Sequence, residues 1–366
     1  MKKKRIRVGV IFGGRSAEHE VSLQSAKNVI DAIDKDKYEV VPIGITKKGE
    51  WFLGNASNPL LNASDPKLVK LNKSNENLAL VPGKEDMQLI SLTNSNADAK
   101  IDAVFPVLHG TYGEDGTMQG LLKLLNVPFV GAGVLGSALG MDKDVMKRLL
   151  NAGGVPTAKF LAFNSEDKIE FASAEKELGL PFFVKPANLG SSVGISKIKT
   201  KEDFLPAIKK AFQYDNKILI EGFVAGREIE CSVLGNENPL ASLPGEVIPT
   251  HEFYSYEAKY IDERGANFEI PAKLPQKTVK KVQDMATKAF KVLCLEGMAR
   301  VDFFLKDDGE VIVNEVNTIP GFTKISMYPK LWEASGISYT ELIDRLITFA
   351  FERYQKEKKL KTSFVK

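Results

Sequence analysis

Short apolar runs alternate with amphipathic runs through the first third of the chain. Residues 7–12 and 38–45 are apolar runs of strand length, and residues 21–33 between them carry apolar side chains at helical spacing. A further run of strand length covers residues 101–108. Strands that alternate with helices are typical of an α/β fold with a parallel sheet. We therefore predict that the chain begins with an open α/β domain.

Polar residues follow two of these strands, at the edge where open α/β sheets bind ligands. Gly13 and Gly14 end the first strand, and Glu18 comes just before the helix. His109 follows the run 101–108 and precedes a glycine-rich loop, which lets a ligand approach the backbone closely. Glu18 and His109 are therefore candidate ligand-binding residues. The alternatives are that Ser16 and Glu18 only cap the helix and complement its dipole, and that His109 is structural.

The stretch from residue 142 to residue 224 again alternates between helical and strand patterns. One of its strands ends in Lys185, which is followed by Gly190-Ser191-Ser192-Val193-Gly194. A lysine neutralises phosphate charge, and glycine and serine groups donate hydrogen bonds to phosphate oxygens, so we predict a phosphate-binding loop. Glu221 and Glu228 follow, where they could hold an adenine amino group or a ribose. The alternative for the loop is a solvent-facing glycine hairpin.

The stretch from residue 300 to residue 317 contains two strand patterns that flank Asp308-Gly309. A two-residue turn at this dipeptide predicts that Phe304 pairs with Val313 and that Asp302 pairs with Glu315. Side chains alternate between the faces of a strand, so Asp302, Glu315 and Asn317 share one face. Oxygen donors of this kind suit Mg²⁺ or Mn²⁺. The alternative is that Arg300, on the same face, balances the two carboxylates without a metal.

Composition limits the classes of partner. The chain is 43% apolar and 27% charged, which is ordinary for a soluble globular protein. Its 50 basic and 47 acidic residues are well mixed and leave a net charge of +3, so nothing indicates binding to nucleic acid or to a membrane. Cys231 and Cys294 lack metal-binding spacing and are expected to be buried thiols. A cytoplasmic location is therefore predicted.

Residues 131–136 match the G-x-G-x-x-G pattern of dinucleotide-binding loops. The acidic residue that this pattern requires about 20 positions later is missing, because residues 149–154 are a predicted helix end. We interpret these glycines as a domain boundary. A nicotinamide-dependent oxidoreductase remains the alternative, and binding of ATP without binding of NAD(P) would exclude it. Residues 55–100 are polar and are expected to form peripheral loops with short strands.

The motifs combine into one pattern along the chain. Lys185 and its Gly-Ser loop are followed by Ile220-Glu221-Gly222-Phe223-Val224-Ala225-Gly226-Arg227-Glu228, then by Arg300-Val301-Asp302 and Asn314-Glu315-Val316-Asn317. This order resembles the ATP-grasp superfamily. The resemblance narrows to the D-alanine:D-alanine ligase family through four segments, residues 13–22, 109–116, 256–260 and 317–321. It extends from residue 8 to about residue 345.

The resemblance implies three domains with ATP bound between the last two. These are an N-terminal α/β domain over 1–135, a small central domain over 136–225 and a C-terminal antiparallel-sheet domain over 226–366. It also implies that ATP drives the joining of two D-alanines through an acyl phosphate, for peptidoglycan precursor synthesis. D-alanine and ATP are then the partners, two Mg²⁺ or Mn²⁺ the metal ions, and a homodimer the expected assembly. D-lactate or D-serine as acceptor, and a non-catalytic nucleotide-binding regulator, stay open as alternatives.

The resemblance also implies a role for each site residue. The catalytic residues would be Glu18, Ser191, Tyr260, Arg300 and Gly321, and the substrate would also contact His109, Ser326 and Met327. ATP would contact Lys143, Lys185, Ser191, Ser192, Glu221, Phe223, Val224, Glu228, Lys259 and Asn314. The metal ligands would be Asp302, Glu315 and Asn317. Residues 251–268 would form a lid that carries Lys259 and Tyr260 and shields the acyl phosphate from water.

Overall fold

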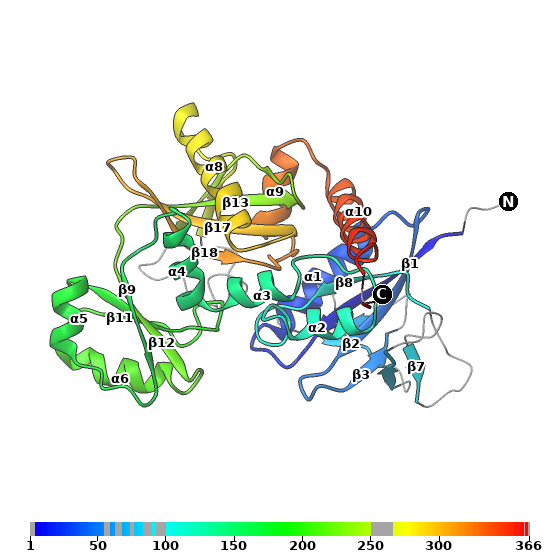
Figure 1. The fold of residues 1–366 in the computed structure, drawn as a ribbon, viewed down its shortest axis with the longest axis horizontal. Helices are drawn as coiled ribbons and strands as arrows, with labels where there is room; N and C mark the ends of the chain where they lie inside the picture. The colour runs from blue at the N-terminus through cyan, green and yellow to red at the C-terminus, as the bar shows by residue number, and fades with distance from the viewer. Residues whose placement is uncertain are drawn as a thin grey trace.

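In the described part of the chain, three β-sheets of four or more strands follow one another. The computed structural model describes residues 4–54, 59–62, 68–73, 77–82, 89–92, 100–249, 266–361 and 363–364. In Figure 1 the central sheet lies at the lower left, the C-terminal sheet at the top and the N-terminal sheet at the lower right. Within the described residues, no helix is long and apolar enough to cross a lipid bilayer. The domain boundaries at residues 135 and 225 stay predictions.

The N-terminal sheet is mostly parallel, as the alternation of strand and helix patterns predicts. Its strand order is β3-β2-β1-β8, with only β3 antiparallel to its neighbour. The strands are β1 (Ile6–Gly13), β2 (Tyr38–Ile45), β3 (Trp51–Leu53) and β8 (Ala103–Val107), and the helices are α1 (His19–Ala32), α2 (Thr117–Leu124) and α3 (Val134–Met141). Two short antiparallel pairs lie beside it, β4 (Leu60–Leu61) with β5 (Lys70–Leu71) and β6 (Leu78–Leu80) with β7 (Leu89–Ser91).

The central sheet is antiparallel, with strand order β11-β10-β12-β9. Its elements are α4 (Lys143–Ala152), β9 (Phe160–Asn164), α5 (Phe171–Leu178), β10 (Phe182–Pro186), β11 (Ser196–Ile198), α6 (Lys201–Ala211) and β12 (Lys217–Gly222). Phe182 and Ile220 point toward helices α5 and α6 and are buried in their core. Because strand side chains alternate between faces, Lys185 and Glu221 point the other way. This face of the sheet borders the site described below.

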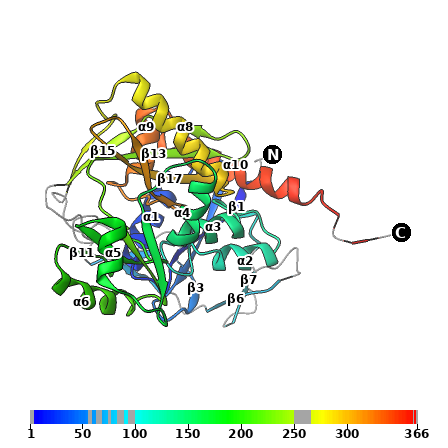
Figure 2. The ribbon, with the colours of Figure 1, turned by 60° about the vertical axis from the view of Figure 1, so that its left-hand side comes forward.

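The C-terminal sheet has the order β16-β15-β13-β17-β18, with β14 paired to β13 and every pair antiparallel. Its elements are β13 (Arg227–Gly235), β14 (Leu240–Ala241), β15 (Gly245–Pro249), β16 (Ala266–Glu269), α8 (Gln276–Val292), β17 (Gly297–Leu305), β18 (Val311–Asn317), α9 (Met327–Ala334) and α10 (Tyr339–Glu357). Helix α8 covers one face of this sheet (Figure 2). Val301 and Phe303 pack under α8, so Arg300 and Asp302 occupy the opposite face.

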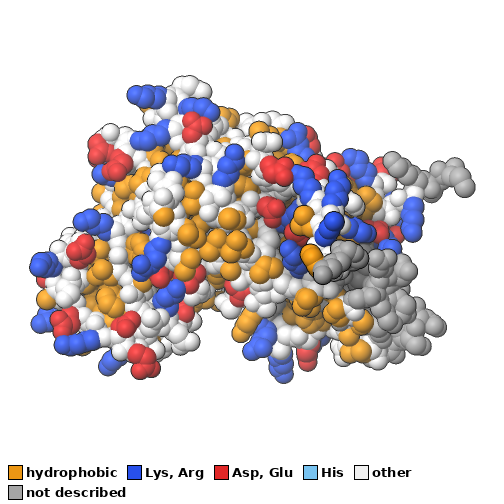
Figure 3. Space-filling model, viewed as in Figure 1, with side chains coloured by type: hydrophobic (Ala, Val, Ile, Leu, Met, Phe, Trp, Pro, Cys, Tyr) orange, Lys and Arg blue, Asp and Glu red, His pale blue; other side chains and the backbone are white. Residues whose placement is uncertain are grey.

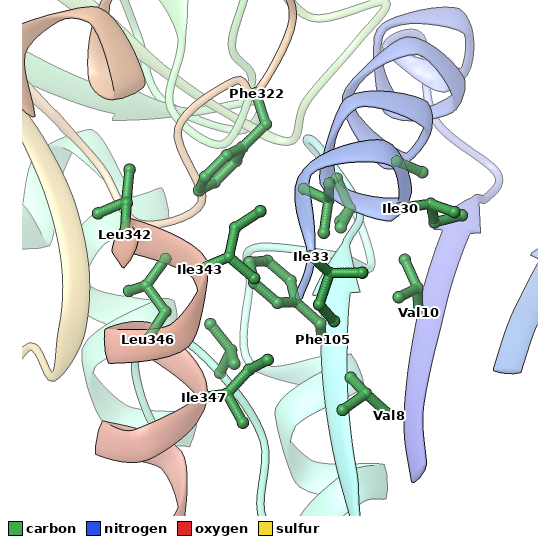
Figure 4. Close-up of a cluster of buried hydrophobic side chains, with 14 of the residues drawn as sticks. Val8, Val10, Ile30, Ile33, Phe105, Phe322, Leu342, Ile343, Leu346 and Ile347 are labelled. Atoms are coloured by element: carbon green, nitrogen blue, oxygen red, sulfur yellow. The ribbon is translucent and has the colours of Figure 1, made fainter. Parts of the chain in front are cut away.

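Helix α10, near the end of the chain, packs against the N-terminal sheet. Ile343, Leu346 and Ile347 of α10 share one buried core with Val8 and Phe105 (Figure 4). Fully burying one such side chain contributes roughly 1.5–3 kcal/mol to the free energy of unfolding. The last helix therefore joins the C-terminal part of the chain to the N-terminal sheet.

The β17–β18 hairpin differs in register from its predicted form. Asp302 does pair with Glu315, as predicted, but Phe304 pairs with Ile312 and not with Val313. The turn is one residue wider than predicted, because the Lys306 N–H donates to the Glu310 carbonyl. A register shift next to Asp302 leaves one extra residue, Asn314, in β18 and restores the predicted pairing of Asp302 with Glu315.

The two cysteines occupy different environments, which corrects the prediction that both are buried. Cys231 is fully buried on β13, and burial raises the pKa of its thiol to about 12. Cys294 is exposed. It lies just after α8 with a positive φ of 53°, in the left-handed region that terminates helices. The position at a helix end explains the exposure, and the sequence spacing alone did not indicate it.

Candidate active site

One continuous cleft lies between the three sheets. The N-terminal domain contributes Glu18 and Glu114 to its lining, the central domain Gly190 and Ser191, and the C-terminal sheet Arg300, Asp302 and Asn317. A second cavity adjoins it and shares Lys143, Ser191, Glu228, Asn314 and Glu315 with the first. Most of the predicted site residues therefore meet in one place. On the face of the molecule seen in Figure 3, Lys and Arg side chains are interspersed with Asp and Glu side chains.

The face of β17 and β18 in the cleft carries a dense cluster of charges. The Arg300 guanidinium donates to both carboxylate oxygens of Asp302 at 2.7 Å, and its Nε lies 2.9 Å from Glu230 Oε2. Asn317 Nδ2 donates to Asp302 Oδ2 at 2.9 Å. Glu315 stands opposite Asp302 in the ladder. The arrangement thus gathers the predicted ligands and also pairs Arg300 with a carboxylate, which was the alternative.

The oxygen donors on this face suit a hard divalent cation. Asp302, Glu315 and Asn317 offer two carboxylates and one amide oxygen, and Mg²⁺ is usually bound by one or two carboxylates together with substrate phosphates. Within the described part of the chain, no group of three or more His, Cys, Asp or Glu side chains could hold an ion. Two carboxylates and one amide oxygen do not fill the six positions around Mg²⁺, so phosphate oxygens and water would have to supply the rest.

Two buried lysines point toward the middle of the cleft. Lys143 Nζ donates to the Leu189 carbonyl at 2.6 Å and lies 3.8 Å from Glu315 Oε2. Lys185 Nζ donates to Glu221 Oε1 at 2.5 Å. Burial lowers the pKa of the Lys143 ammonium, and the nearby Glu315 opposes this shift. A basic centre of this kind attracts phosphate groups.

The loop after Lys185 has the backbone of an anion-binding loop. Ser191 and Ser192 both have positive φ, at 54° and 60°, and Gly194 follows at 74°. Within the loop the Val193 N–H donates to the Gly190 carbonyl at 3.2 Å, which closes a tight turn. Non-glycine residues with positive φ concentrate at functional sites, because the surrounding structure must hold them there. Gly190 and Ser191 line both cavities, so this loop does not face open solvent, and phosphate binding by it stays a prediction.

Glu18 faces the cleft and does not cap helix α1 with its side chain. Its Oε1 accepts a hydrogen bond from Ser191 Oγ, so the N-terminal domain and the central loop are tied together. The fit is tight, because a Cβ on Gly110 would lie 2.6 Å from Glu18 Oε2. Gly110 has a φ of +75°, so two constraints favour glycine there. The helix-capping alternative for Glu18 is thus disfavoured.

Glu114 is a site residue that the sequence reasoning missed. It lines the cleft and accepts hydrogen bonds from the Gly110 N–H at 2.7 Å and from the Ile319 N–H at 2.9 Å. Burial and the nearby Glu18 carboxylate raise the pKa of Glu114 to about 8. The sequence did contain an indication of Glu114, because it lies in the same glycine-rich loop as His109, directly after the strand pattern at 101–108.

His109 is buried and lines neither cavity of the cleft; it lines a separate cavity together with Gly13 and Gly14. Its Nδ1 is 3.0 Å from the Ile319 carbonyl oxygen, and its Nε2 is 3.0 Å from Ser25 Oγ. Burial lowers the pKa of the imidazole to about 4, so it is neutral at physiological pH. Both ring nitrogens have protein partners, which favours a positioning role. Direct contact with substrate stays a prediction.

The remaining predicted residues divide into three groups. Gly321, Ser326 and Met327 line the main cavity, where the loop after β18 enters α9. The second cavity is lined by Lys185, Ser192, Glu221, Phe223, Val224, Glu228 and Asn314. Lys259, Tyr260 and most of the predicted lid lie outside the described residues, which resume at residue 266.

Two family models together match most of the chain. The "D-ala D-ala ligase N-terminus" matches residues 7–132, and the "D-ala D-ala ligase C-terminus" matches residues 149–348. A D-alanine–D-alanine ligase of Oceanobacillus iheyensis is 58% identical over 365 residues, covering 99% of each chain.

The chain belongs to the D-alanine–D-alanine ligase family. The D-alanine–D-alanine ligase A of Escherichia coli is 52% identical over 362 residues, covering 98% of this chain and 100% of the relative. This membership supports the ATP-grasp fold and disfavours the nicotinamide-dependent alternative.

Solved structures of this ligase family share the fold. That of the ligase from Coxiella burnetii has a TM-score of 0.84 at 38% identity, covering 98% of this chain and 97% of its own. The VanG D-Ala:D-Ser ligase from Enterococcus faecalis has a TM-score of 0.83 at 35% identity, with coverages of 95% and 100%. A Bacillus anthracis ligase solved with ATP has a TM-score of 0.72 at 29% identity, with coverages of 96% and 99%.

The raised pKa of Glu114 predicts how stability depends on pH. The carboxyl titrates near 8 in the folded chain, against 4.5 as its ordinary value, so folding keeps a proton bound between these values. The free energy of unfolding should therefore fall as pH rises from about 5 to about 9. Glu114→Gln carries no ionisable group and should lose less stability over this range. Urea unfolding at several pH values measures the difference.

Glu177 is an exposed residue of α5. Glu177→Gln is the matched control for this experiment, and it should retain the wild-type pH dependence. Parallel pH profiles for Glu114→Gln and the wild type would contradict the assignment of a raised pKa to Glu114.

Proposed function

We propose that this chain joins two molecules of D-alanine into D-alanyl-D-alanine, using ATP and releasing ADP and phosphate. The observation that carries the proposal is the single cleft in which Glu18, the lysine pair, the Gly-Ser loop and Arg300 converge. Membership in the ligase family supports the same reaction. The product would serve peptidoglycan precursor synthesis.

The first D-alanine would bind at the N-terminal end of the cleft. Glu18 is only 8% exposed, and a carboxylate in such a place attracts the substrate ammonium strongly because little water screens it. Ser191 orients Glu18 through its hydroxyl. The substrate carboxylate would then extend toward the phosphate loop and the lysines. Glu18 therefore fixes which end of the substrate meets ATP.

ATP would occupy the second cavity, with its phosphates directed toward the first. Lys143, Lys185 and the backbone of residues 190–194 would bind the phosphates, while Glu221 and Glu228 would bind the adenine and the ribose. A carboxylate is a poor electrophile, and transfer of the γ-phosphate to it gives an acyl phosphate with a good leaving group. Phosphoryl transfer of this kind depends mainly on positioning and on charge neutralisation.

Asp302, Glu315 and Asn317 would hold the divalent cations, in line with the donor set described above. Bound Mg²⁺ or Mn²⁺ supplies charge neutralisation for the phosphate oxygens. The chain's own contribution is to present two carboxylates on adjacent strands at a fixed register.

The second D-alanine would bind near Ser326 and Met327, with its amine facing the acyl phosphate. Attack of the amine on the acyl carbon forms the new C–N bond and an oxyanion, and the phosphate then leaves with the carboxylate oxygen that it acquired. Arg300 and the Gly321 N–H would donate to the oxyanion. Preorganised donors of this kind stabilise the transition state more than the bound substrate.

Four further predictions belong to this proposal. Lys259 and Tyr260 would lie on a lid that excludes water from the acyl phosphate. Two copies of the chain would form a homodimer, and the protein would act in the cytoplasm. The acceptor would be D-alanine, although the relatives include a D-Ala:D-Ser ligase.

Arg300→Ala should separate the oxyanion role from a structural one. Loss of one oxyanion donor costs on the order of 100- to 1,000-fold in rate, so kcat for peptide formation should fall by about that factor. The dissociation constant for ATP should change little. Steady-state kinetics and ATP titration measure the two quantities, with a thermal melt to confirm folding. Equal losses in both would identify Arg300 as a structural partner of Asp302 and Glu230.

The proposed reaction itself is tested by phosphate release in a panel of acceptors. The wild type should release phosphate with D-alanine and ATP and should form mainly the dipeptide when D-alanine, D-serine and D-lactate compete. Mainly ester or D-alanyl-D-serine product would overturn the acceptor assignment, and no D-alanine-dependent release would overturn the proposal.

Glu315→Gln, which removes one carboxylate at nearly constant volume, should lose Mg²⁺-dependent turnover while keeping its fold.

A further inference from the structure

Lys147 is a fully buried cation that the proposed mechanism does not use. It lies on α4 with a side-chain exposure of 0%, and its Nζ is 2.5 Å from Glu221 Oε2. It does not line either cavity of the cleft. Taking a lysine out of water is costly unless a carboxylate compensates for the lost hydration. Burial lowers the pKa of the Lys147 ammonium, and the adjacent Glu221 carboxylate opposes this shift.

Glu221 uses its two carboxylate oxygens for two different lysines. Oε1 accepts from Lys185 Nζ at 2.5 Å on the cleft side, and Oε2 pairs with Lys147 Nζ at the same distance. Glu221 itself lines the second cavity, where the adenine is proposed to bind. The carboxylate thus connects a cation inside the protein to the nucleotide pocket.

The charges around Glu221 decide its protonation state. Lys143 and Lys147 face it from α4 and Lys185 from β10, while Glu315 on β18 interacts with the same lysines. Burial alone would raise the pKa of Glu221, but Lys147 and Lys185 outweigh burial and hold it below its ordinary value. On β9, the residue opposite Glu221 is Phe160, which adds no charge. Glu221 is therefore ionised at neutral pH.

The protonation state determines which purine Glu221 can bind. An ionised carboxylate only accepts hydrogen bonds, whereas a protonated one also donates. The 6-amino group of adenine is a donor, and the 6-oxo group of hypoxanthine is an acceptor. An ionised Glu221 matches adenine and leaves a 6-oxo purine facing a like-charged oxygen.

We propose that Lys147 is a positioning residue for nucleotide selection, which holds Glu221 as an acceptor-only carboxylate so that the pocket takes a 6-amino purine triphosphate over a 6-oxo one. This inference rests on the proposed function, because it assumes that ATP binds in the second cavity. Lys147 acts through Glu221 and touches neither the nucleotide nor the reacting atoms.

Lys147→Met keeps the length of the side chain and removes its charge. The ratio of kcat/KM for ATP to kcat/KM for ITP should fall by about 10- to 100-fold, the range that one hydrogen bond to a charged group sets. With only Lys185 and Lys143 left to oppose burial, Glu221 should titrate at higher pH. The ratio in the variant should then rise with pH, while the wild-type ratio stays flat around neutrality.

Arg148→Met is the matched control on the same helix. Arg148 and Lys147 both lie over the Phe160 ring, at 5.9 and 6.0 Å from its centroid, but Arg148 is exposed and pairs with Asp144. This variant removes a neighbouring cation without touching Glu221, so it should keep the wild-type ratio and its flat pH profile. An unchanged, pH-independent ratio in a folded Lys147→Met would overturn the proposal.

A double-mutant comparison covers the case in which Lys147→Met does not fold. Glu221→Gln and Lys147→Met/Glu221→Gln leave no buried unpaired carboxylate, and both should show the same lowered ratio, because Lys147 acts only through Glu221. A further fall in the double variant would contradict the proposal. Absence of any D-alanine-dependent turnover in the wild type would instead count against the proposed function, so the two failures are distinguishable.

Discussion

The cleft depends on the segment 318–323, which ties the C-terminal sheet to the N-terminal domain. The Ile319 N–H donates to Glu114 Oε1, and the Ile319 carbonyl oxygen accepts from His109 Nδ1. The Phe322 N–H donates to Ser25 Oγ. The Phe322 ring packs edge-on against Phe105 at 5.7 Å between centroids. Because this segment follows directly on Asn317, its anchoring positions the face of β17 and β18 that carries Asp302 and Glu315 in the same cleft as Glu18. Without these contacts the substrate and phosphate ends of the cleft would not be held in register.

Charge compensation is the second constraint on the cleft. Buried carboxylates and lysines lie within a few ångströms of one another, and each isolated charge would be costly to bury. The structure pairs them in chains, in which Glu221 joins Lys147 to Lys185 and Arg300 joins Asp302 to Glu230. The network thus compensates the buried charges of the cleft in the free protein.

The sequence predicted those features that depend on local patterns. Strand β2 has the predicted bounds, and the Asp302–Glu315 pair was expected from the Asp-Gly turn. The register beyond that pair was wrong, because Gly309 serves equally well in a three-residue turn and a bulge at Asn314 corrects the offset. Neither the wider turn nor the bulge leaves a separate periodic signal.

Features that arise from long-range packing could not be predicted. From the sequence alone, Lys147 is indistinguishable from a surface lysine of a helix. Only the three-dimensional structure shows that Glu221 lies beside it. His109 was indicated by its place at a strand end, but its partners Ser25 and Ile319 come from distant segments. The packing of α10 on the N-terminal sheet likewise depends on contacts across most of the chain.

The central claim is that the cleft activates a carboxylate by phosphoryl transfer before the peptide bond forms. D-alanine labelled with ¹⁸O in both carboxylate oxygens tests it directly, with mass spectrometry of the released phosphate. The account predicts that each phosphate carries one labelled oxygen, since the oxygen that bonds to phosphorus leaves with it. Unlabelled phosphate alongside dipeptide formation would contradict the acyl-phosphate route and the assignment of the lysines and Arg300 to it.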